Sequence, residues 1–373
     1  MGSVTGADGM LDQIDKLQTD LPILVDATLA ALLSNSRSLL RTRFEKVTVT
    51  GCGDSLQAAF AAAPAFARLA MQPLDVMGPR RLIADLHAKS GLRRQLVIGI
   101  SASGGTPAVC QALEKANAAG ALTLAIVGRE NSKMAALASE TLLIPLPDAV
   151  VGPGIRTYQA SLVGLFLLAV CLGFFAGRSS SRDVDEWPST MRDVAKALGE
   201  TIEATKPVMA GIAQETADFP AMFFLAAGQH LATARYAAAK RVEASGLYAT
   251  GQDLEEAWHI ERFARPRDLP VAVIAPPGAT LEEAEAACCH ARGIGRRVFV
   301  LTCSAETAIR QHATVALDLS PPPFEFLAPF VCHPVFTQMA AHEALLLGCL
   351  PFRADSPEIA ADLAAYMKSA AYS

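Results

Sequence analysis

The sequence is poor in charge and has no run rich in lysine and arginine. Charged residues make up 18% of its 373 residues, and the formal net charge is −5. This mild acidity argues against a nucleic-acid-binding surface. The hydrophobic share of 51% excludes a disordered chain. The low charge indicates surface hidden in a subunit interface, and the length indicates two or three domains.

The cysteines lack the spacing of a disulfide framework or a metal site. Eight are present, none forms C-x-x-C, and Cys288 and Cys289 are adjacent. We therefore expect reduced core thiols in a cytoplasmic protein. The N-terminus shows neither the basic nor the apolar region of a signal peptide. No histidine or cysteine spacing indicates zinc, so we expect no metal and no cofactor.

One uncharged stretch, Thr157–Gly177, is long enough to cross a membrane. It is the only such stretch, and its flanks, Arg156 and Arg178, give no orientation bias. A helix buried between subunits explains the pattern equally well, and we expect no membrane partner.

Short β-rich runs alternate with alanine-rich helical runs, which is typical of α/β proteins. Eight runs are predicted as strands: Val47–Thr50, Leu96–Ile100, Leu122–Val127, Thr141–Pro145, Phe223–Ala226, Val271–Ala275, Val298–Thr302 and Val315–Leu319. Predicted helices include Gln57–Leu69, Pro107–Ala119 and Leu281–Arg292, with another ending at Ser245.

The order of the first half returns in the second half. Gly51 and Gly228 are 177 positions apart, and Thr106 and Thr280 are 174 apart. These offsets predict a duplicated α/β unit of about 175 residues, with Ala176–Glu186 as linker. The expected division is a helical arm at 1–45, a first domain at 46–178, linker and second domain at 179–333, and a helical tail at 334–373.

The segment Ser101–Thr106 is the first candidate site. A strand delivers three hydroxyls and two glycines to a helix that begins at Pro107, with Thr106 as its predicted N-cap. Free backbone N–H groups and the helix dipole favour an anion at such a corner. The absence of lysine excludes a Walker loop and favours a monophosphate. An ordinary capped turn is the alternative.

The second repeat serves as an internal control. Its equivalent loop, Pro276-Pro277-Gly278-Ala279-Thr280, lacks the serines and has two prolines, which have no N–H to donate. Only the first repeat has the composition of an anion site, so we expect one ligand for each pair of repeats.

Two segments of the second half carry groups that can move protons. Tyr236, Lys240 and Glu243 share one helix face, which is either a solvated stripe or a functional one. The segment Asp253–Glu261 contains His259, an imidazole among carboxylates. A carboxylate and an imidazole can move protons between the carbons and oxygens of a sugar.

Together these segments resemble the sugar isomerase (SIS) family, in particular paired-SIS proteins such as the isomerase half of glucosamine-6-phosphate synthase. Gly51–Ser55 resembles the family's C-G-T-S corner, with Asp54 in place of threonine, and Ser101–Thr106 resembles its S-x-S-G-x-T phosphate loop. Ala238–Glu243 resembles the segment that carries the catalytic glutamate, and His259 follows at the family's spacing. The resemblance covers nearly the whole chain.

The resemblance implies two tandem SIS domains, each a flavodoxin-like three-layer α/β/α sandwich with a mostly parallel sheet. It implies phosphate binding by Ser101, Ala102, Ser103 and Thr106, with Gly53, Asp54 and Ser55 nearby. Glu243 would move the proton between C1 and C2 through an enediol or enamine, with Lys240 beside it, and His259 would assist ring opening. In relatives this histidine reaches the neighbouring subunit, so a homodimer with shared active sites is expected.

The implied activity is that of an enzyme on a hexose 6-phosphate or on an amino-sugar or fructosamine phosphate. An isomerase, a deaminase and a deglycase remain open, with amino-sugar or glycated-amine chemistry favoured. A non-catalytic phosphosugar sensor is the alternative.

Several residues depart from the family pattern. Tyr236 replaces a glutamate, and Arg156-Thr157-Tyr158 replaces S-T-K. Asp362 stands in the register of the family's tail lysine, and Lys368 could substitute for that lysine only if the tail is shifted. Met1 is not followed by the cysteine of a glutaminase domain.

Overall fold

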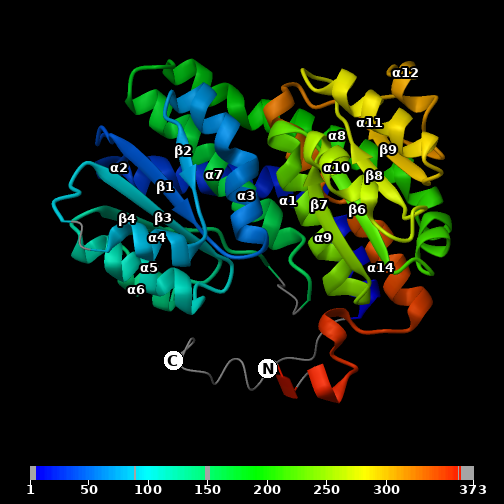
Figure 1. Cartoon of the computed structure of the whole chain (residues 1–373). Helices are drawn as coiled ribbons and strands as arrows, with labels where there is room; N and C mark the ends of the chain where they lie inside the picture. Colours follow the sequence, from blue (N-terminus) through cyan, green and yellow to red (C-terminus); the bar gives the residue numbers. More distant parts are fainter. Residues whose placement is uncertain (1–5, 88–89, 148–151, 360, 363–373) are drawn as a thin grey trace. The chain divides into compact units, whose positions relative to one another are not determined.

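The computed structural model describes residues 6–87, 90–147, 152–359 and 361–362. The chain divides into two compact units, each built around its own sheet (Figure 1). The N-terminal unit contains the described residues between 19 and 147 together with 156–192. The C-terminal unit contains 6–18, 152–155 and the described residues from 193 onwards.

The sheet of the N-terminal unit has five parallel strands in the order β2-β1-β3-β4-β5. The strands are β1 (Lys46–Thr50), β2 (Leu74–Val76), β3 (Gln95–Ser101), β4 (Leu122–Val127) and β5 (Glu140–Leu143). The helices are α2 (Arg37–Leu40), α3 (Asp54–Ala65), the π-helix η1 (Phe66–Ala70), α4 (Pro79–Leu86), α5 (Pro107–Ala118), α6 (Lys133–Leu137) and α7 (Arg156–Phe175).

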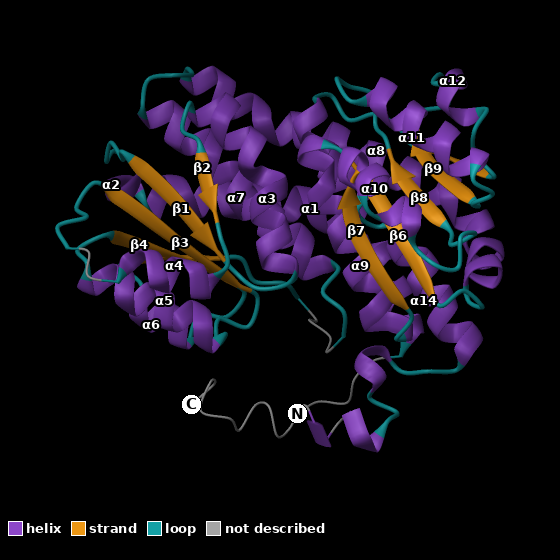
Figure 2. Cartoon of the chain, viewed as in Figure 1, coloured by secondary structure: helices purple, strands orange, loops and turns teal. Residues whose placement is uncertain are grey.

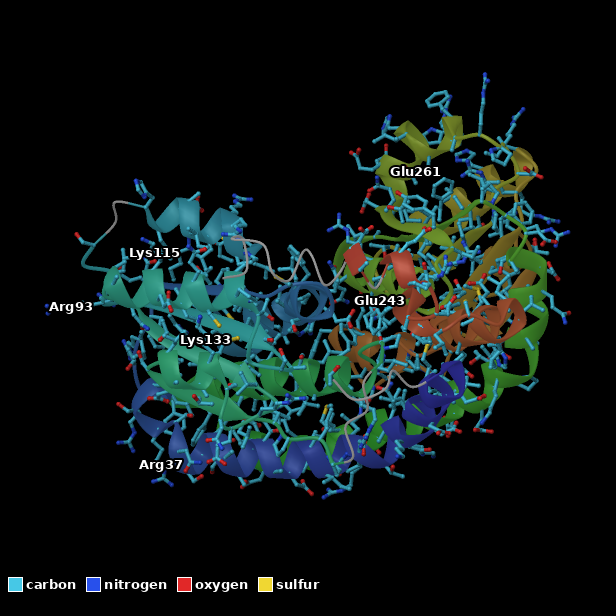
Figure 3. All side chains as sticks on the ribbon, turned by 90° about the horizontal axis from the view of Figure 1, so that it is seen from below. Arg37, Arg93, Lys115, Lys133, Glu243 and Glu261 are labelled. Carbon is cyan, nitrogen blue, oxygen red and sulfur yellow. The ribbon has the colours of Figure 1, made fainter. Side chains whose placement is uncertain are left out.

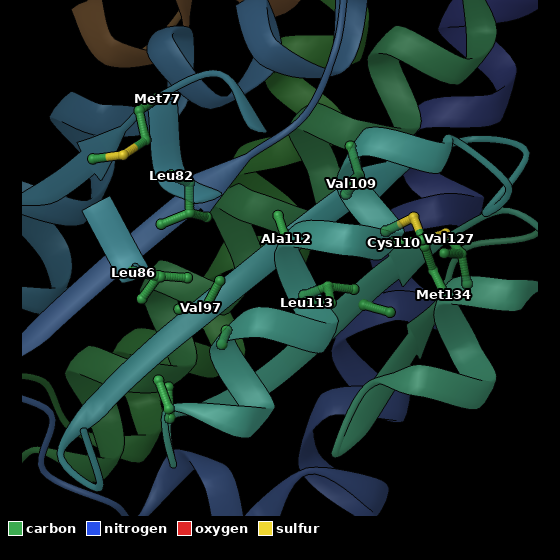
Figure 4. Close-up of a cluster of buried hydrophobic side chains, with 14 residues drawn as sticks. Met77, Leu82, Leu86, Val97, Val109, Cys110, Ala112, Leu113, Val127 and Met134 are labelled. Atoms are coloured by element: carbon green, nitrogen blue, oxygen red, sulfur yellow. The ribbon is translucent and has the colours of Figure 1, made fainter. Parts of the chain in front are cut away.

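Helices cover both faces of this sheet (Figure 2). Val97 of β3 and Val127 of β4 belong to a buried cluster with side chains of α4, α5 and α6 (Figure 4). Successive strand residues point to opposite faces, so Ile126 lies on the other side of β4. There it packs against Gly164 of α7. The result is a three-layer α/β/α sandwich.

The C-terminal unit repeats this arrangement with the order β10-β9-β8-β6-β7, again with parallel strands. The strands are β6 (Ala221–Ala226), β7 (Tyr248–Asp253), β8 (Val271–Ile274), β9 (Val298–Thr302) and β10 (Val315–Asp318). The helices are η2 (Gly228–His230), α9 (Leu231–Ser245), α10 (Leu254–His259), η3 (Glu261–Phe263), α11 (Leu281–Gly293), α12 (Thr307–Arg310), η4 (Glu325–Leu327), α13 (Ala328–Cys332), α14 (Val335–Leu347) and η5 (Pro351–Arg353).

This sheet is also covered on both faces. Phe223 and Leu225 of β6 pack with residues of α10 and α11 in one buried cluster. Phe224 points the other way and meets Phe336 of α14, with ring centroids 5.4 Å apart. The alternation along β6 therefore gives the same three layers.

The predicted duplication is confirmed. Numbered within its own unit, each sheet has the strand order 2-1-3-4-5, which is the flavodoxin-like order. The first residues of β1 and β6 are 175 positions apart, and those of β3 and β8 are 176 apart. The two strands that the sequence did not indicate, β2 and β7, are the corresponding edge strands, whose residues are mostly half-buried.

Two long helices, α1 (Ala7–Asn35) and α8 (Ser181–Thr216), contribute residues to both units. The expected N-terminal helical arm is therefore present as α1 and α2. The predicted linker at 176–186 is wrong for its second half, because α8 already begins at Ser181. Ser180 caps that start through hydrogen bonds with Asp183.

By length and composition, α1 and α7 could each cross a membrane. In α7, 89% of the most apolar window is buried inside the chain, against 44% in α1. A helix that is apolar all round is typical of a core position. The burial of α7 comes from its own chain, including α3 and η1, so no neighbouring subunit is required to explain it.

Candidate functional site

A pocket of about 260 Å³ lies at the carboxyl ends of β1 and β3 in the N-terminal unit. In flavodoxin-like sheets the strand order reverses between these two strands, and ligands bind in the crevice formed there. The lining residues are Cys52, Asp54, Ser55, Ser101, Ala102, Ser103, Thr157, Tyr158 and Ser161. The pocket therefore brings together most of the candidate phosphate-binding residues.

The hydroxyls of the loop after β3 form one hydrogen-bonded group. The Oγ of Ser101 lies 2.8 Å from Thr106 Oγ1 and 3.3 Å from Ser103 Oγ. Ser101 Oγ also accepts a hydrogen bond from the Gly104 N–H, and Ser103 Oγ accepts one from the Gly105 N–H. A hydroxyl that accepts from a backbone N–H keeps its own proton to donate, so this group is suited to binding oxyanions.

The helix start is as predicted, but the cap is not made by the threonine side chain. Thr106 is the N-cap of α5 and Pro107 its first residue. The Thr106 hydroxyl makes no capping hydrogen bond and instead contacts Ser101. The N-terminal end of this 12-residue helix adds the positive end of its dipole to the loop.

Gly104 is the residue that fixes the shape of this loop. Its φ is +64°, and a Cβ there would lie 2.3 Å from the Cβ and Oγ of Ser132. The Gly104 N–H donates to the Ser101 carbonyl, and the Gly104 carbonyl accepts from the Met134 N–H. Only glycine meets both the conformational and the steric requirement.

Helix α7 supplies pocket residues that were not among the candidates. Thr157 and Tyr158 at its start, and Ser161 about one helical turn later, complete the wall. Arg156 anchors this end through a buried ion pair with Asp20 and a hydrogen bond to the Pro147 carbonyl. The departure at Arg156-Thr157-Tyr158 was the available sequence signal.

The corresponding position of the C-terminal unit holds a carboxylate. Glu325 Oε1 lies 3.5 Å from Nε2 of His230, which follows β6. A Cβ on Gly278, in the loop after β8, would lie 2.6 Å from the Glu325 carboxyl carbon. Burial lowers the pKa of His230, and the neighbouring Glu325 opposes this change in part. An anion would meet negative charge here.

Lys240 and Glu243 form an ion pair on α9, also in the C-terminal unit. Lys240 is completely buried, while the Glu243 side chain is 28% exposed. The ammonium lies 5.2 Å from the centre of the buried Tyr236 ring. The solvated-stripe alternative is therefore wrong for Tyr236 and Lys240, and Glu243 is the member of the group that solvent reaches.

Tyr236 is held on two sides. Its hydroxyl donates to the Gly154 carbonyl at 3.1 Å, and its ring meets that of His333 edge-to-face. Complete burial lowers the pKa of His333 to about 3. The ring keeps Lys240 in an aromatic surrounding that favours a cation.

His259 lies apart from this group in the described structure. It ends α10, its side chain is 62% exposed, and its Nε2 lies 3.0 Å from Glu255 Oε1. In the part of the chain that is described, no contact joins it to Lys240 or Glu243. Lys368 lies outside the described residues. Within them, no group of three or more His, Cys, Asp or Glu side chains is placed to hold a metal.

Comparison with known proteins agrees with this architecture. Residues 42–171 match the SIS domain model. The glutamine–fructose-6-phosphate aminotransferase (isomerizing) of Pyrococcus horikoshii is 26% identical over 84% of this chain. That match covers 51% of the archaeal protein, so the chain spans about half the length of this curated relative.

Solved structures show the same fold over nearly the whole chain. The C-terminal domain of glucosamine-fructose-6-phosphate aminotransferase from Francisella tularensis has a TM-score of 0.80 at 17% identity, covering 92% of this chain and 97% of that one. Glucosamine-6-phosphate deaminase from Thermotoga maritima has a TM-score of 0.71 at 17% identity, covering 92% and 96%.

Proposed function

Because residues 42–171 match the SIS domain model and 92% of the chain shares the fold of the C-terminal domain of a glucosamine-fructose-6-phosphate aminotransferase, we propose that this protein is a phosphosugar-converting enzyme. The substrate class is a hexose 6-phosphate or an amino-sugar or fructosamine phosphate. The observation that carries the proposal is the pair of hydroxyls of Ser101 and Ser103 in the wall of a pocket at the strand-order reversal, with Thr106 hydrogen-bonded to Ser101.

In this proposal the loop binds the phosphate. Ser101 is buried and orders the two more accessible hydroxyls of Ser103 and Thr106. Neutral donors and a helix N-terminus suffice for one phosphate group, and hydrogen bonds to a charged oxygen are stronger than neutral ones. Gly53 and Ser55 belong to the corner after β1, where they form the start of α3. Desolvation raises the pKa of the Cys52 thiol, so a thiolate nucleophile is not part of the proposal.

Glu243 is the proposed base. Its carboxylate would take a proton from the carbon next to the sugar carbonyl, leaving the electron pair in an enediol or enamine, and return the proton to the neighbouring carbon. The buried ammonium of Lys240 pairs with that carboxylate and fixes its orientation. Isomerase, deaminase and deglycase reactions all begin with this transfer, and amino-sugar or glycated-amine chemistry is favoured.

The exposure of His259 supports a further part of the proposal. An imidazole that protrudes from its own subunit is available to a neighbouring one. We therefore propose a homodimer in which His259 assists ring opening in the partner's site. The free cysteines support a cytoplasmic location.

The test combines turnover with binding. Glu243→Gln should abolish turnover of the substrate found in a screen of sugar 6-phosphates, and phosphosugar binding should survive. Ser103→Ala should weaken that binding by about 1–2 kcal/mol, because one donor to a charged oxygen is lost. Glu282→Gln is the matched control, because this exposed glutamate on α11 of the same unit lies outside the candidate residues and is expected to leave turnover unchanged.

Any of three results would overturn the assignment. Full turnover by Glu243→Gln would exclude Glu243 as the base. Phosphosugar binding without turnover in the unaltered protein would favour a non-catalytic phosphosugar sensor. Equal binding of phosphorylated and unphosphorylated sugars removes the phosphate loop from the argument.

A further inference from the structure

The N-terminal unit contains a second cavity, of about 400 Å³, near the amino ends of β1 and β3. Its volume is within the range of small-molecule sites, about 300–1,000 Å³. Val47 of β1 and Arg94, which directly precedes β3, both belong to its wall. The candidate phosphate pocket lies at the opposite ends of the same two strands.

Four arginines and no carboxylate line this cavity, which we call the arginine pocket. Its charged residues are Arg41, Arg43, Arg94 and Arg178. Arg94 pairs with Glu45 at 2.9 Å, and both of these side chains are more than half exposed. Among the described residues, the guanidinium groups of Arg43 and Arg178 have no carboxylate partner. The pocket therefore carries net positive charge in a chain whose overall charge is −5.

The remaining wall of the arginine pocket is largely apolar. Leu40, Val47 and Leu172 are buried, and Phe175 is half-buried. The Arg41 guanidinium lies 5.9 Å from the centre of the Phe175 ring. Arginine binds phosphates in a bidentate manner and stacks on aromatic faces, so charged and apolar recognition are combined here.

The backbone at the edge of this pocket is strained. Met71 is 62% exposed and has a φ of +52°, a conformation that non-glycine residues rarely adopt. It follows the π-helical turn η1, another irregularity that is frequent at functional sites. Gly173 of α7 packs so closely on η1 that a Cβ would lie 2.2 Å from the Leu69 carbonyl oxygen. The surrounding packing thus holds the strained segment in place.

We propose that the arginine pocket binds an organic diphosphate with an aromatic body, of the nucleoside diphosphate class. The free guanidinium groups would hold the phosphates, and Phe175 with the buried aliphatic wall would hold the ring system. This site is distinct from the candidate phosphate pocket, because Thr157 and Phe175 of α7 line different pockets and are about 27 Å apart along the helix.

The experiment is calorimetric titration of the full chain with ADP, adenosine and pyrophosphate. ADP should bind one to one, and adenosine and pyrophosphate should each bind at least about tenfold more weakly, because each lacks one half of the recognition. The double variant Arg43→Gln, Arg178→Gln should weaken ADP binding by about tenfold or more. Arg93→Gln is the matched control, since this exposed arginine of the same unit is not part of the pocket (Figure 3).

The controls separate this site from the phosphate loop. Ser103→Ala should leave ADP affinity unchanged. Loss of ADP binding in Ser103→Ala, equal loss in Arg93→Gln, pyrophosphate binding as tight as that of ADP, or no binding of ADP would each overturn the proposal.

Discussion

The two units share one backbone fold but have different groups at the reversal of strand order, hydroxyls in the first and a carboxylate in the second. At the β1/β3 reversal Ser101 and Ser103 line a pocket, and Ser101 shares a hydrogen bond with Thr106 at the start of α5. At the β6/β8 reversal the Glu325 carboxylate lies beside Gly278 and His230. Both sheets have the same order and nearly the same spacing in the chain. The fold therefore determines where a ligand could bind, and the loop residues determine whether an anion is accepted.

Alanine substitution of the equivalent glycines Gly104 and Gly278 should give the largest difference between the two units. Gly104→Ala should destabilise the protein by about 3 kcal/mol, because a left-handed φ and a clash with Ser132 add together. It should also abolish phosphosugar binding, since the hydroxyl group loses its geometry. Urea unfolding and calorimetry measure both effects.

Gly278→Ala is the matched variant, 174 positions later in the chain. Its Cβ would meet only the end of the flexible Glu325 side chain, so the cost should stay below about 1 kcal/mol. Equal destabilisation by the two variants would contradict the difference proposed between the loops.

Two buried histidines of the C-terminal unit should make the folding stability of the protein fall at acidic pH. Burial lowers the pKa of His333 to about 3 and also lowers that of His230. The unfolded chain takes up protons on these residues near their ordinary pKa of about 6.5. The unfolded state thus binds more protons, and stability falls as the pH drops from about 7, by up to ~1.4 kcal/mol per pH unit for each histidine.

Glu325→Gln sharpens this prediction. The carboxylate raises the pKa of His230, so its removal should lower that pKa further and extend the loss of stability to lower pH. The measurement is the urea midpoint between pH 7.5 and 4.5, with the exposed Glu358→Gln as control. A midpoint that does not fall on acidification would exclude these histidines as its source.

The sequence predicts the repeat and its loops because local patterns encode them. Both strand runs at 122–127 and 298–302 match β4 and β9, and Thr106-Pro107 begins α5 as predicted. These elements depend on hydrophobic runs and on backbone preferences of single residues.

What the sequence could not predict depends on contacts between distant segments. Glu325 is 95 positions from His230, and Tyr158 reaches a pocket whose loop ends 52 positions earlier, at Thr106. The burial of Lys240 is another case, because its helix is covered by α14 and by β7 on faces that periodicity alone does not identify. The secondary-structure propensity of single residues does not show which distant segments will come into contact.

Substitution of Asp54 has the smallest expected effect and tests the charge of the N-terminal pocket directly. It brings one carboxylate into the pocket of the N-terminal unit, where the resemblance leads us to expect threonine. Asp54→Asn should tighten phosphosugar binding a few-fold, since a like charge near a phosphate costs about 1 kcal/mol or less in a solvated site. The variant should lose about 0.5 kcal/mol of stability, because Asp54 is in the first turn of α3.

Calorimetry at two salt concentrations is the measurement, and the exposed Asp85→Asn on α4 is the control. The gain should shrink at high salt, because screening weakens the repulsion that Asp54 exerts. If Asp54→Asn instead weakens binding, and salt does not change the loss, the carboxylate accepts a hydrogen bond from a sugar hydroxyl. The pocket would then differ from its counterpart beside Glu325 in having a second polar anchor as well as in accepting a phosphate.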